Sequence, residues 1–313
     1  MIQLTKFLYS LIKIGIMIET PTVFVLGAGA SIPYGYPSGD ILRKQICSEL
    51  ENPSHPYTLE LIKQGFSQDE ISDFRESFFY SAKLSIDAFL EYRTEFMEIG
   101  KLVIARSLIP FENTNSLFED GAGKWYGYFY NRLNTSFDEF DKNEFSIITF
   151  NYDRSFEQFL FTALKHSYNK SSSDCAEKLE KIPIVHVHGI LNNLDWQYVG
   201  GRPYDRNTLS GRDLKDSAEG IKIIHENIND SKSFKDAHKL LDDSEKIYFF
   251  GFGYNKTNLE RLKISDYLDR TIQGTSAGLL NAESVYARKL FDQKITLFDY
   301  DTLGFLRTHF DFE

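Results

Sequence analysis

TVFVLGAGAS, at Thr22–Ser31, is the segment from which the fold class follows. Its first five residues are β-branched or apolar and predict a buried strand, which ends sharply at Gly27. The segment Ser38–Leu50 follows with helical spacing, and either Ser38 or Asp40 is placed to cap its first turn. A strand, a glycine-rich turn and a helix in this order form the first half of a nucleotide-binding βαβ unit.

Four more segments have the composition of buried strands, and helical patterns separate them along the chain. These segments are 145–151 (FSIITFN), 183–189 (PIVHVHG), 245–253 (EKIYFFGFG) and 294–299 (KITLFD). Strands that alternate with helices predict an α/β fold. We therefore expect a Rossmann-like, mostly parallel sheet with helices on both faces and a helical insertion.

Two insertions interrupt this pattern. Residues of about 57–140 have helical spacing and predict a helical insertion, whereas about 191–243 are polar and irregular, with one helix expected near 217–227. Residues 1–16 are interpreted as an N-terminal extension, because their apolar run is too short to span a bilayer and no cleavage site follows it. The domain itself is expected to cover 17–313.

Composition excludes several classes of function. The 313 residues carry 35 Lys and Arg against 45 Asp and Glu, a net charge of −10. The chain as a whole therefore lacks the basic excess of a nucleic-acid binder, although a local basic patch is compatible with this charge, and binding to an anionic membrane is disfavoured. Cys47 and Cys175 are too few for a disulfide framework or a four-cysteine zinc site. We expect a cytoplasmic protein with two free thiols and no metal.

Polar or glycine-rich motifs end four of the strands, where open α/β sheets bind ligands. The glycines of Gly27–Ser31 let a backbone approach a pyrophosphate, although the same residues also make a tight turn. Asn151 carries amide donors and an acceptor for a ribose or a water. Asp153 has the alternative role of capping the next helix.

Two histidines and a second glycine pair complete the set. Alternation places His186 and His188 on the same face of their strand, with His188 suited to general-base catalysis and His186 to a structural role. A metal site made by this pair lacks a third ligand cluster. Gly251 and Gly253 end the fourth strand, where Asn255 either binds a ribose or caps a helix.

In chain order, the four strand ends carry GAGAS, TFNYD, HVHG and GFG. In these motifs and their order the chain resembles the sirtuin (silent information regulator) superfamily, which shows a GAG-x-S turn, a T-x-N-x-D strand end, an H-G strand end and a later glycine-rich strand end. The resemblance covers the sheet-forming segments and neither insertion.

The resemblance implies a binding site for NAD⁺. The Gly27–Ser31 turn would hold the pyrophosphate, Asn151 the nicotinamide ribose and the attacking water, and His188 would be the base. Asp153 would lie near the carboxamide, and the GFG glycines would border the adenosine half. The cofactor-binding residues expected on this basis are Gly27, Ala28, Gly29, Ala30, Ser31, Pro37, Thr149, Asp153, Gly251, Gly253 and Asn255, and the catalytic residues are Asn151 and His188.

Two departures disfavour the deacylases of the superfamily. Their four-cysteine zinc module cannot exist here, and Pro37–Asp40 replaces their phenylalanine–arginine pair. The pattern looks more like the bacterial sirtuin-like NAD⁺ hydrolases of antiphage defence, which deplete cellular NAD⁺. This resemblance implies NAD⁺ as substrate, a homo-oligomer, and a defence-system partner such as a HerA-type ATPase or a short Argonaute-type sensor.

The expected reaction is hydrolysis of the nicotinamide–ribose bond to nicotinamide and ADP-ribose. One alternative is a zinc-free NAD-dependent deacylase or ADP-ribosyl transferase, and another is a non-catalytic module that senses NAD⁺ or ADP-ribose. The enzymatic hypotheses require Asn151 and His188 to converge on one crevice, beside the Gly27–Ser31 turn, that admits a dinucleotide.

Overall fold

The computed structural model describes residues 17–133, 135–205, 210–223 and 231–312. The expected extension at 1–16 and the end of the helix expected near 217–227 therefore lie outside the described residues. The described part contains one six-stranded sheet. Its strands are β1 (Thr22–Leu26), β2 (Phe145–Thr149), β3 (Ile184–His186), β4 (Lys246–Phe250), β5 (Thr271–Thr275) and β6 (Thr296–Phe298).

The sheet has the order β3-β2-β1-β4-β5-β6, and every neighbouring pair of strands is parallel. This order is that of the Rossmann fold, in which the connections reverse direction between β1 and β4. The fold class expected from the sequence is thus confirmed. The carboxyl ends of β1, β2 and β4 meet at one edge of the sheet, which is where the polar and glycine-rich motifs lie.

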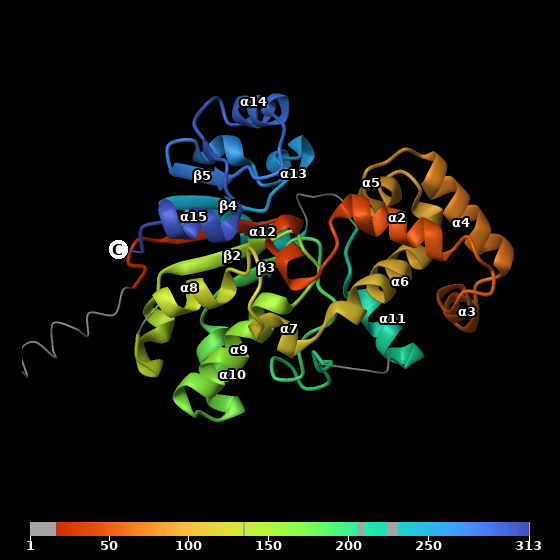
Figure 1. The fold of residues 1–313 in the computed structure, drawn as a ribbon, viewed down its shortest axis with the longest axis horizontal. Coiled ribbons are helices and arrows are strands. Elements are labelled where there is room, and N and C mark those ends of the chain that lie inside the picture. Colours follow the sequence, from red (N-terminus) through yellow and green to blue (C-terminus); the bar gives the residue numbers. More distant parts are fainter. Residues whose placement is uncertain (1–16, 134, 206–209, 224–230, 313) are drawn as a thin grey trace, which may run out of the picture.

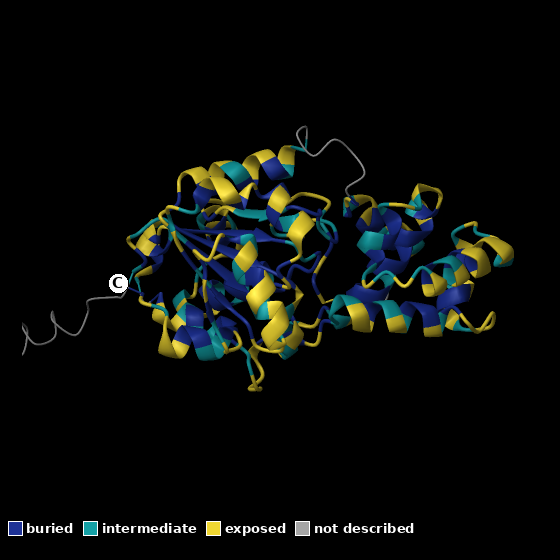
Figure 2. Ribbon diagram, turned by 90° about the horizontal axis from the view of Figure 1, so that it is seen from above, coloured by how far each residue is buried: buried dark blue, intermediate teal, exposed yellow. Residues whose placement is uncertain are grey.

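Alternating side chains bury both faces of the sheet. Phe24 and Leu26 belong to one apolar cluster, and Val23 and Val25 to a second on the opposite face. Helices α8 (Tyr126–Arg132), α9 (Ser155–Tyr168), α10 (Ser172–Glu180) and α15 (Thr302–Thr308) contribute to the first cluster, and α12 (Lys232–Asp242), α13 (Lys256–Arg261) and α14 (Asn281–Leu290) to the second. Figure 2 shows the result, with buried strands inside and helices exposed on their outer sides.

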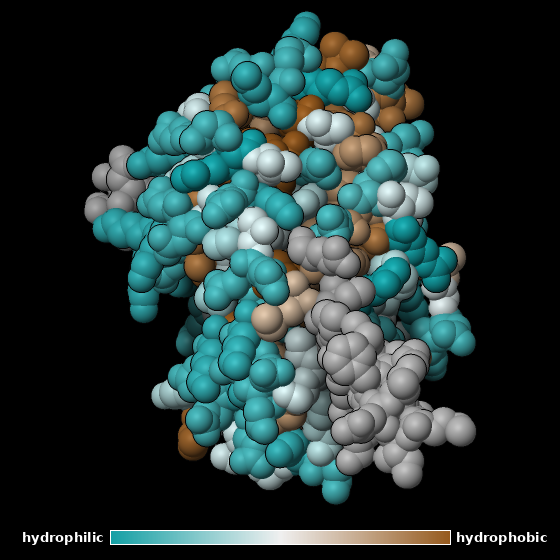
Figure 3. All heavy atoms as spheres, turned by 90° about the vertical axis from the view of Figure 1, so that its left-hand side faces the viewer, coloured by the Kyte–Doolittle hydropathy of each residue, from teal (hydrophilic) through white to brown (hydrophobic). Residues whose placement is uncertain are grey.

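The helices that pack on the sheet are short to medium in length. They are α7 (Thr114–Phe118), α8 (Tyr126–Arg132), α9 (Ser155–Tyr168), α10 (Ser172–Glu180), α12 (Lys232–Asp242), α13 (Lys256–Arg261), α14 (Asn281–Leu290) and α15 (Thr302–Thr308). The face of the molecule in Figure 3 is largely hydrophilic, because the apolar sides of these helices are turned inward. Within the described residues, none of the helices has the length and apolar character needed to cross a bilayer.

The remaining helices form a separate helical unit to one side of the sheet (Figure 1). They are α2 (Gly39–Glu49), α3 (Pro56–Lys63), α4 (Gln68–Tyr80), α5 (Ile86–Leu90), α6 (Met97–Leu108) and α11 (Gly211–Gly220). Edge-to-face ring contacts join Phe74 to Phe89 and to Phe96, giving this unit an aromatic core. The side chain of Ser38 accepts a hydrogen bond from Ile41 N, so Ser38 caps α2.

The structure corrects several details of the sequence interpretation. Strand β5 (TIQGT) was not expected, because it lacks an apolar run and contains Gly274, where a Cβ would lie 2.1 Å from the Tyr254 hydroxyl. The polar composition of 170–181 (KSSSDCAEKLEK) predicts a surface connection, but this segment forms helix α10, which a capping box of Ser171 and Asp174 starts. The helix expected near 217–227 begins earlier, as α11. The helical spacing of 85–109 predicts one long helical stretch, but the structure breaks it between α5 and α6.

Candidate functional site

The glycine-rich turn after β1 packs directly against the turn after β4, where the strand connections reverse. Gly27 N donates to Phe250 O at 3.0 Å, and Gly29 N donates to Gly251 O at 2.9 Å. A Cβ on Gly29 would lie 2.7 Å from Gly251 Cα, and Gly251 itself has a φ of +56°. Because the two turns touch through their backbones, they require these glycines whatever ligand lies beside them.

Asn151, just beyond β2, is hydrogen-bonded to the turn after β1. Its Nδ2 donates to Gly27 O at 2.9 Å and to Ser31 Oγ at 3.1 Å. The backbone N–H of Asn151 donates to Thr149 Oγ1 at 3.1 Å. Ser31 Oγ in turn donates to Asp153 Oδ2 at 2.8 Å. The structure thus joins five of the expected residues in one cluster. Asn151 Oδ1 accepts no hydrogen bond from any described residue, so it is available to a ligand.

Asp153 is buried beneath this cluster. Its Oδ1 accepts hydrogen bonds from the backbone N–H of Ser155, at 3.1 Å, and from the Ser155 hydroxyl. Burial raises the pKa of the Asp153 carboxyl, and hydrogen bonds from Ser155 and Ser31 oppose that rise. Asp153 therefore holds the first residue of α9 and orients Ser31 toward Asn151. It is not the cap of α9, since the N-cap position is Arg154, which makes no side-chain capping hydrogen bond.

A cavity of about 100 Å³ lies between this cluster and the helical unit. Five expected site residues line it on one side, and the helical unit forms the other side with Gly39, Leu42, Asp87 and Leu108. The five are Ala28, Ser31, Pro37, Asn151 and Asp153. Ligand pockets generally measure roughly 300–1,000 Å³, so a dinucleotide does not fit the cavity in this conformation.

His188 lies next to this cavity but is not among the residues that line it. Its side chain is 6% exposed, and its ring centroid is 5.3 Å from that of Phe150 and 6.4 Å from that of Tyr152, both of which line the cavity. Nδ1 of His188 is buried without a hydrogen-bond partner among the described residues. The expected convergence of Asn151 and His188 on one crevice is therefore not seen in the structure.

The seam between the sheet and the helical unit runs past His188. Arg261 of α13 forms an ion pair of 2.7 Å with Glu91, the residue after α5, and the Tyr152 hydroxyl donates to Asp87. Burial lowers the pKa of His188, while the nearby carboxylates of Asp87 and Glu91 raise it and Arg261 lowers it, leaving a net decrease. His188 is consequently a neutral imidazole at neutral pH, able to accept a proton.

His186 occupies a structural position, as the sequence suggested. Its Nε2 lies 2.6 Å from Glu157 Oε1, and its Nδ1 lies 2.8 Å from Asn151 O. His186 therefore helps to fix the backbone of Asn151. Burial alone would lower the pKa of His186, but the charge and hydrogen bond of Glu157, the hydrogen bond to Asn151 and the charge of Asp153 together raise it. The expected common face of His186 and His188 is wrong, because β3 ends at His186 and a turn follows.

Gly253 and Asn255 lie at a second cavity, of about 490 Å³, beside α13 and α14. Asn255 Oδ1 accepts the backbone N–H of Asn258 at 3.3 Å and so caps α13. This cavity shares no lining residue with the one beside Asn151. Of the remaining expected residues, Ala30 is buried and its carbonyl accepts a hydrogen bond from Trp125 Nε1 at 2.9 Å.

A buried ion cluster near the site was missed by the sequence interpretation. Arg154 Nε and Nη2 donate to Glu112 at 2.8 and 2.9 Å, and Arg202 also pairs with Glu112. Burial raises the pKa of Glu112, although both arginines act to lower it. Arg154 Nη1 also donates to Asn193 O, at 3.0 Å, which fixes the segment after β3. No local pattern reveals this cluster, because its members are far apart in the chain.

The described residues contain no group of three or more His, Cys, Asp or Glu side chains placed to hold a metal ion. Cys47 and Cys175 are free and buried. No family model and no curated protein matches the chain.

Proposed function

We propose that the protein is an NAD⁺ hydrolase that cleaves the nicotinamide–ribose bond at the seam between the sheet and the helical unit. The main support is the position of Asn151, whose Nδ2 is held by Gly27 O and Ser31 Oγ while Oδ1 remains available beside a cavity. The site lies at the carboxyl ends of parallel strands, next to the reversal in strand order, where such sheets bind nucleotides.

The residues fit a dissociative hydrolysis. Nicotinamide leaves with the electron pair of the broken bond, so it departs neutral and leaves an oxocarbenium-like ribose, and water then adds to the anomeric carbon. Asn151 Oδ1 would orient that water or a ribose hydroxyl, and neutral His188 would take the proton that the water loses. General-base help of this kind contributes roughly 10²–10⁴-fold.

Access for NAD⁺ requires the seam to open. The side of the cavity formed by Gly39, Leu42 and Asp87 belongs to the helical unit, and His188 lies against the same seam. Movement of the helical unit away from the sheet would enlarge the cavity and bring His188 and Asn151 to one space. We further propose that a homo-oligomer or a defence-system partner supplies the signal that opens the seam. The antiphage role would then follow from the NAD⁺ that the opened enzyme consumes.

A sensor that binds NAD⁺ or ADP-ribose without turnover is the second candidate. The observation that favours it is the burial of His188 behind Phe150 and Tyr152, outside the cavity. A sensor would bind NAD⁺ and release no nicotinamide.

The deciding experiment is incubation of the chain with NAD⁺, with and without the products of neighbouring genes, and identification of the products by mass spectrometry. We expect nicotinamide and ADP-ribose, and a loss of at least about 100-fold in rate for His188→Ala and Asn151→Ala. The matched controls are His166→Ala and Asn131→Ala, at exposed positions away from the seam. Full turnover by either site variant would refute the assignment, and binding without products would select the sensor.

The acid limb of the pH profile tests His188 separately. Because the pKa of His188 is lowered from 6.5, the activity that depends on its neutral form should persist below pH 6.5. A fall in kcat/KM on acidification whose midpoint lies at or above pH 6.5 would contradict the assignment of His188 as the base.

A further inference from the structure

We propose that the free edge of β3 binds a basic, extended segment of a partner protein as an additional strand of the sheet. Among the described strands, β3 lies at one end of the sheet and pairs with β2 alone. Ile147 N donates to Pro183 O at 2.8 Å, and Val187 N donates to Thr149 O at 3.0 Å. Backbone groups alternate along a parallel strand, so the N–H and C=O of Ile184 point away from β2, and no other described backbone group pairs with them.

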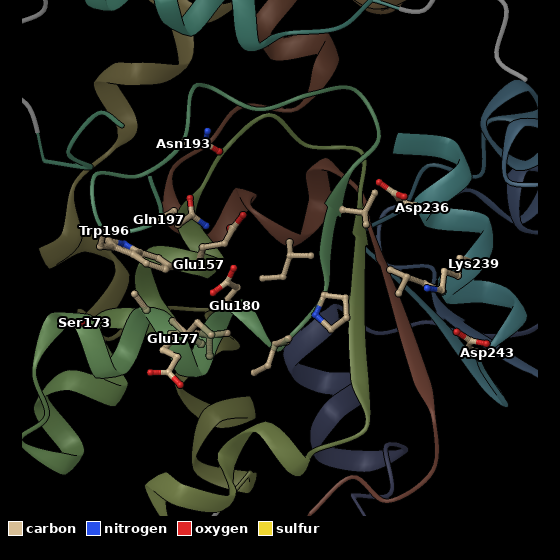
Figure 4. A pocket seen from close by; sticks show the side chains of 18 residues that line it. Glu157, Ser173, Glu177, Glu180, Asn193, Trp196, Gln197, Asp236, Lys239 and Asp243 are labelled. Carbon is tan, nitrogen blue, oxygen red and sulfur yellow. The ribbon is translucent and has the colours of Figure 1, made fainter. Parts of the chain in front are cut away.

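A groove of about 870 Å³ follows this free edge. Figure 4 shows its lining side chains coming from α9 and α10 on one side and from α12 on the other, with Asn193, Trp196 and Gln197 above. Its apolar lining includes Leu160, Ile182, Ile184, Val185 and Leu240. The groove thus combines unpaired strand groups with apolar contacts for alternate side chains, as strand addition requires.

The charge of the groove selects the kind of partner. Glu177, Glu180, Asp236 and Asp243 line it, are exposed, and form no hydrogen bond or ion pair with any described residue. Among the described residues that line the groove, Lys239 is the one basic side chain. Lysine or arginine side chains on an added strand would lie against these carboxylates, whereas the same edge of a second copy would bring carboxylates together.

Acidic side chains near a strand edge can also have a purely protective role, since charges prevent unwanted pairing of the edge with other strands. That role and the proposed one differ in what they allow. Protection predicts that no strand binds, whereas a docking groove admits a basic strand and rejects an acidic one.

The test uses a fluorescent eight-residue peptide that alternates lysine and valine, added to the full chain and followed by anisotropy. We expect saturable binding that weakens with salt. A glutamate-for-lysine peptide, and a lysine–valine peptide N-methylated on alternate backbone amides, should each bind at least tenfold more weakly. The N-methylated peptide matters because it keeps the charge while losing strand hydrogen bonds.

Protein variants locate the binding. E177K/E180K should weaken the lysine–valine peptide at least tenfold, whereas D69K/E76K, an exposed pair of equal charge change on α4, should not. Hydrogen exchange at the Ile184 amide should slow when the peptide binds.

Three results would overturn the proposal. The first is the absence of saturable binding of the lysine–valine peptide, and the second is equal affinity for that peptide and its N-methylated form. The third is self-association of the chain that E177K/E180K abolishes while the affinity for the peptide stays unchanged.

Discussion

At the residue scale, neighbouring glycines of similar appearance in the sequence have different physical roles. Gly251 has φ +56°, and a Cβ there would lie 2.1 Å from Ala30 N. Gly253 has no heavy atom within 4 Å of its Cβ position and no positive φ. The first is therefore required for the two turns to pack, and the second is free to serve a ligand.

This difference predicts the outcome of two alanine substitutions. Gly251→Ala should lower the free energy of unfolding by at least about 2 kcal/mol, because both the backbone conformation and the space exclude a Cβ. Gly253→Ala should change it by less than about 1 kcal/mol. Urea denaturation measures both, and equal losses would show that the contact between the turns does not hold the fold.

The two histidines also differ at this scale. The pKa of His186 is raised from 6.5, and it pairs with Glu157 at 2.6 Å between side chains that are 8% and 5% exposed. The folded pKa thus lies above the unfolded one. The stabilisation by this pair is complete below pH 6.5 and is lost as the pH rises through the folded pKa.

Glu157→Gln should therefore destabilise the protein more at pH 6 than at pH 8. We expect a loss of about 3 kcal/mol at pH 6, since a buried pair would be broken while His186 still favours a proton in the unfolded chain. Glu177→Gln, at an exposed position on α10, should have little effect at either pH. A loss that is the same at both pH values would exclude a charged pair.

At the element scale, strong apolar runs could be predicted from the sequence and weak ones could not. β1, β2 and β4 carry four or five buried residues each and were recognised. β5 has three polar residues and a glycine within five positions, so its strand conformation depends on pairing with β4 rather than on its composition. For α10, a signal was present in Ser171 and Asp174, but its polar composition suggested a loop.

The buried ion cluster connects elements that lie far apart in the chain. Glu112 follows the short helix after α6, Arg154 precedes α9, and Arg202 belongs to the segment after β3. The side chains of the Arg154–Glu112 ion pair are 0% and 1% exposed. Such contacts depend on tertiary structure alone, and this is why the cluster could not be predicted.

Glu112→Gln should cost about 3–5 kcal/mol of unfolding free energy, because it leaves two buried guanidinium groups without their carboxylate. The matched substitution Glu139→Gln removes an exposed pair with Lys142 and should cost less than about 1 kcal/mol. Thermal or urea unfolding measures both. If Glu112→Gln were as mild as Glu139→Gln, the cluster would not carry the connection between these elements.

At the scale of the whole molecule, the order of motifs along the chain predicted which strand ends meet, since parallel strands place their carboxyl ends at one edge. Asn151 and Ser31 are 120 residues apart in sequence and lie 3.1 Å apart. The sequence could not predict the position of His188, because a turn redirects it toward the helical unit. It also could not predict that the helical unit would close the cavity.

The ion pair between Arg261 and Glu91 joins the two parts of the molecule across the closed seam, and this gives a prediction about access. If NAD⁺ binds only when the seam opens, any contact that exists only in the closed state lowers the apparent affinity. Glu91→Gln should then lower the apparent Kd for a non-hydrolysable NAD⁺ analogue by up to about fivefold, the range of a partly exposed ion pair. It should also speed hydrogen exchange in α5.

Glu260→Gln is the matched control for Glu91→Gln, because Glu260 pairs with Lys256 within α13 and spans no seam. Calorimetry of both variants with the same analogue separates the opening of the seam from a general change of charge, since each loses one carboxylate. An unchanged Kd in Glu91→Gln, with exchange in α5 like that of the control, would mean that the seam does not limit access. NAD⁺ would then have to reach Asn151 by a route that leaves the helical unit in place.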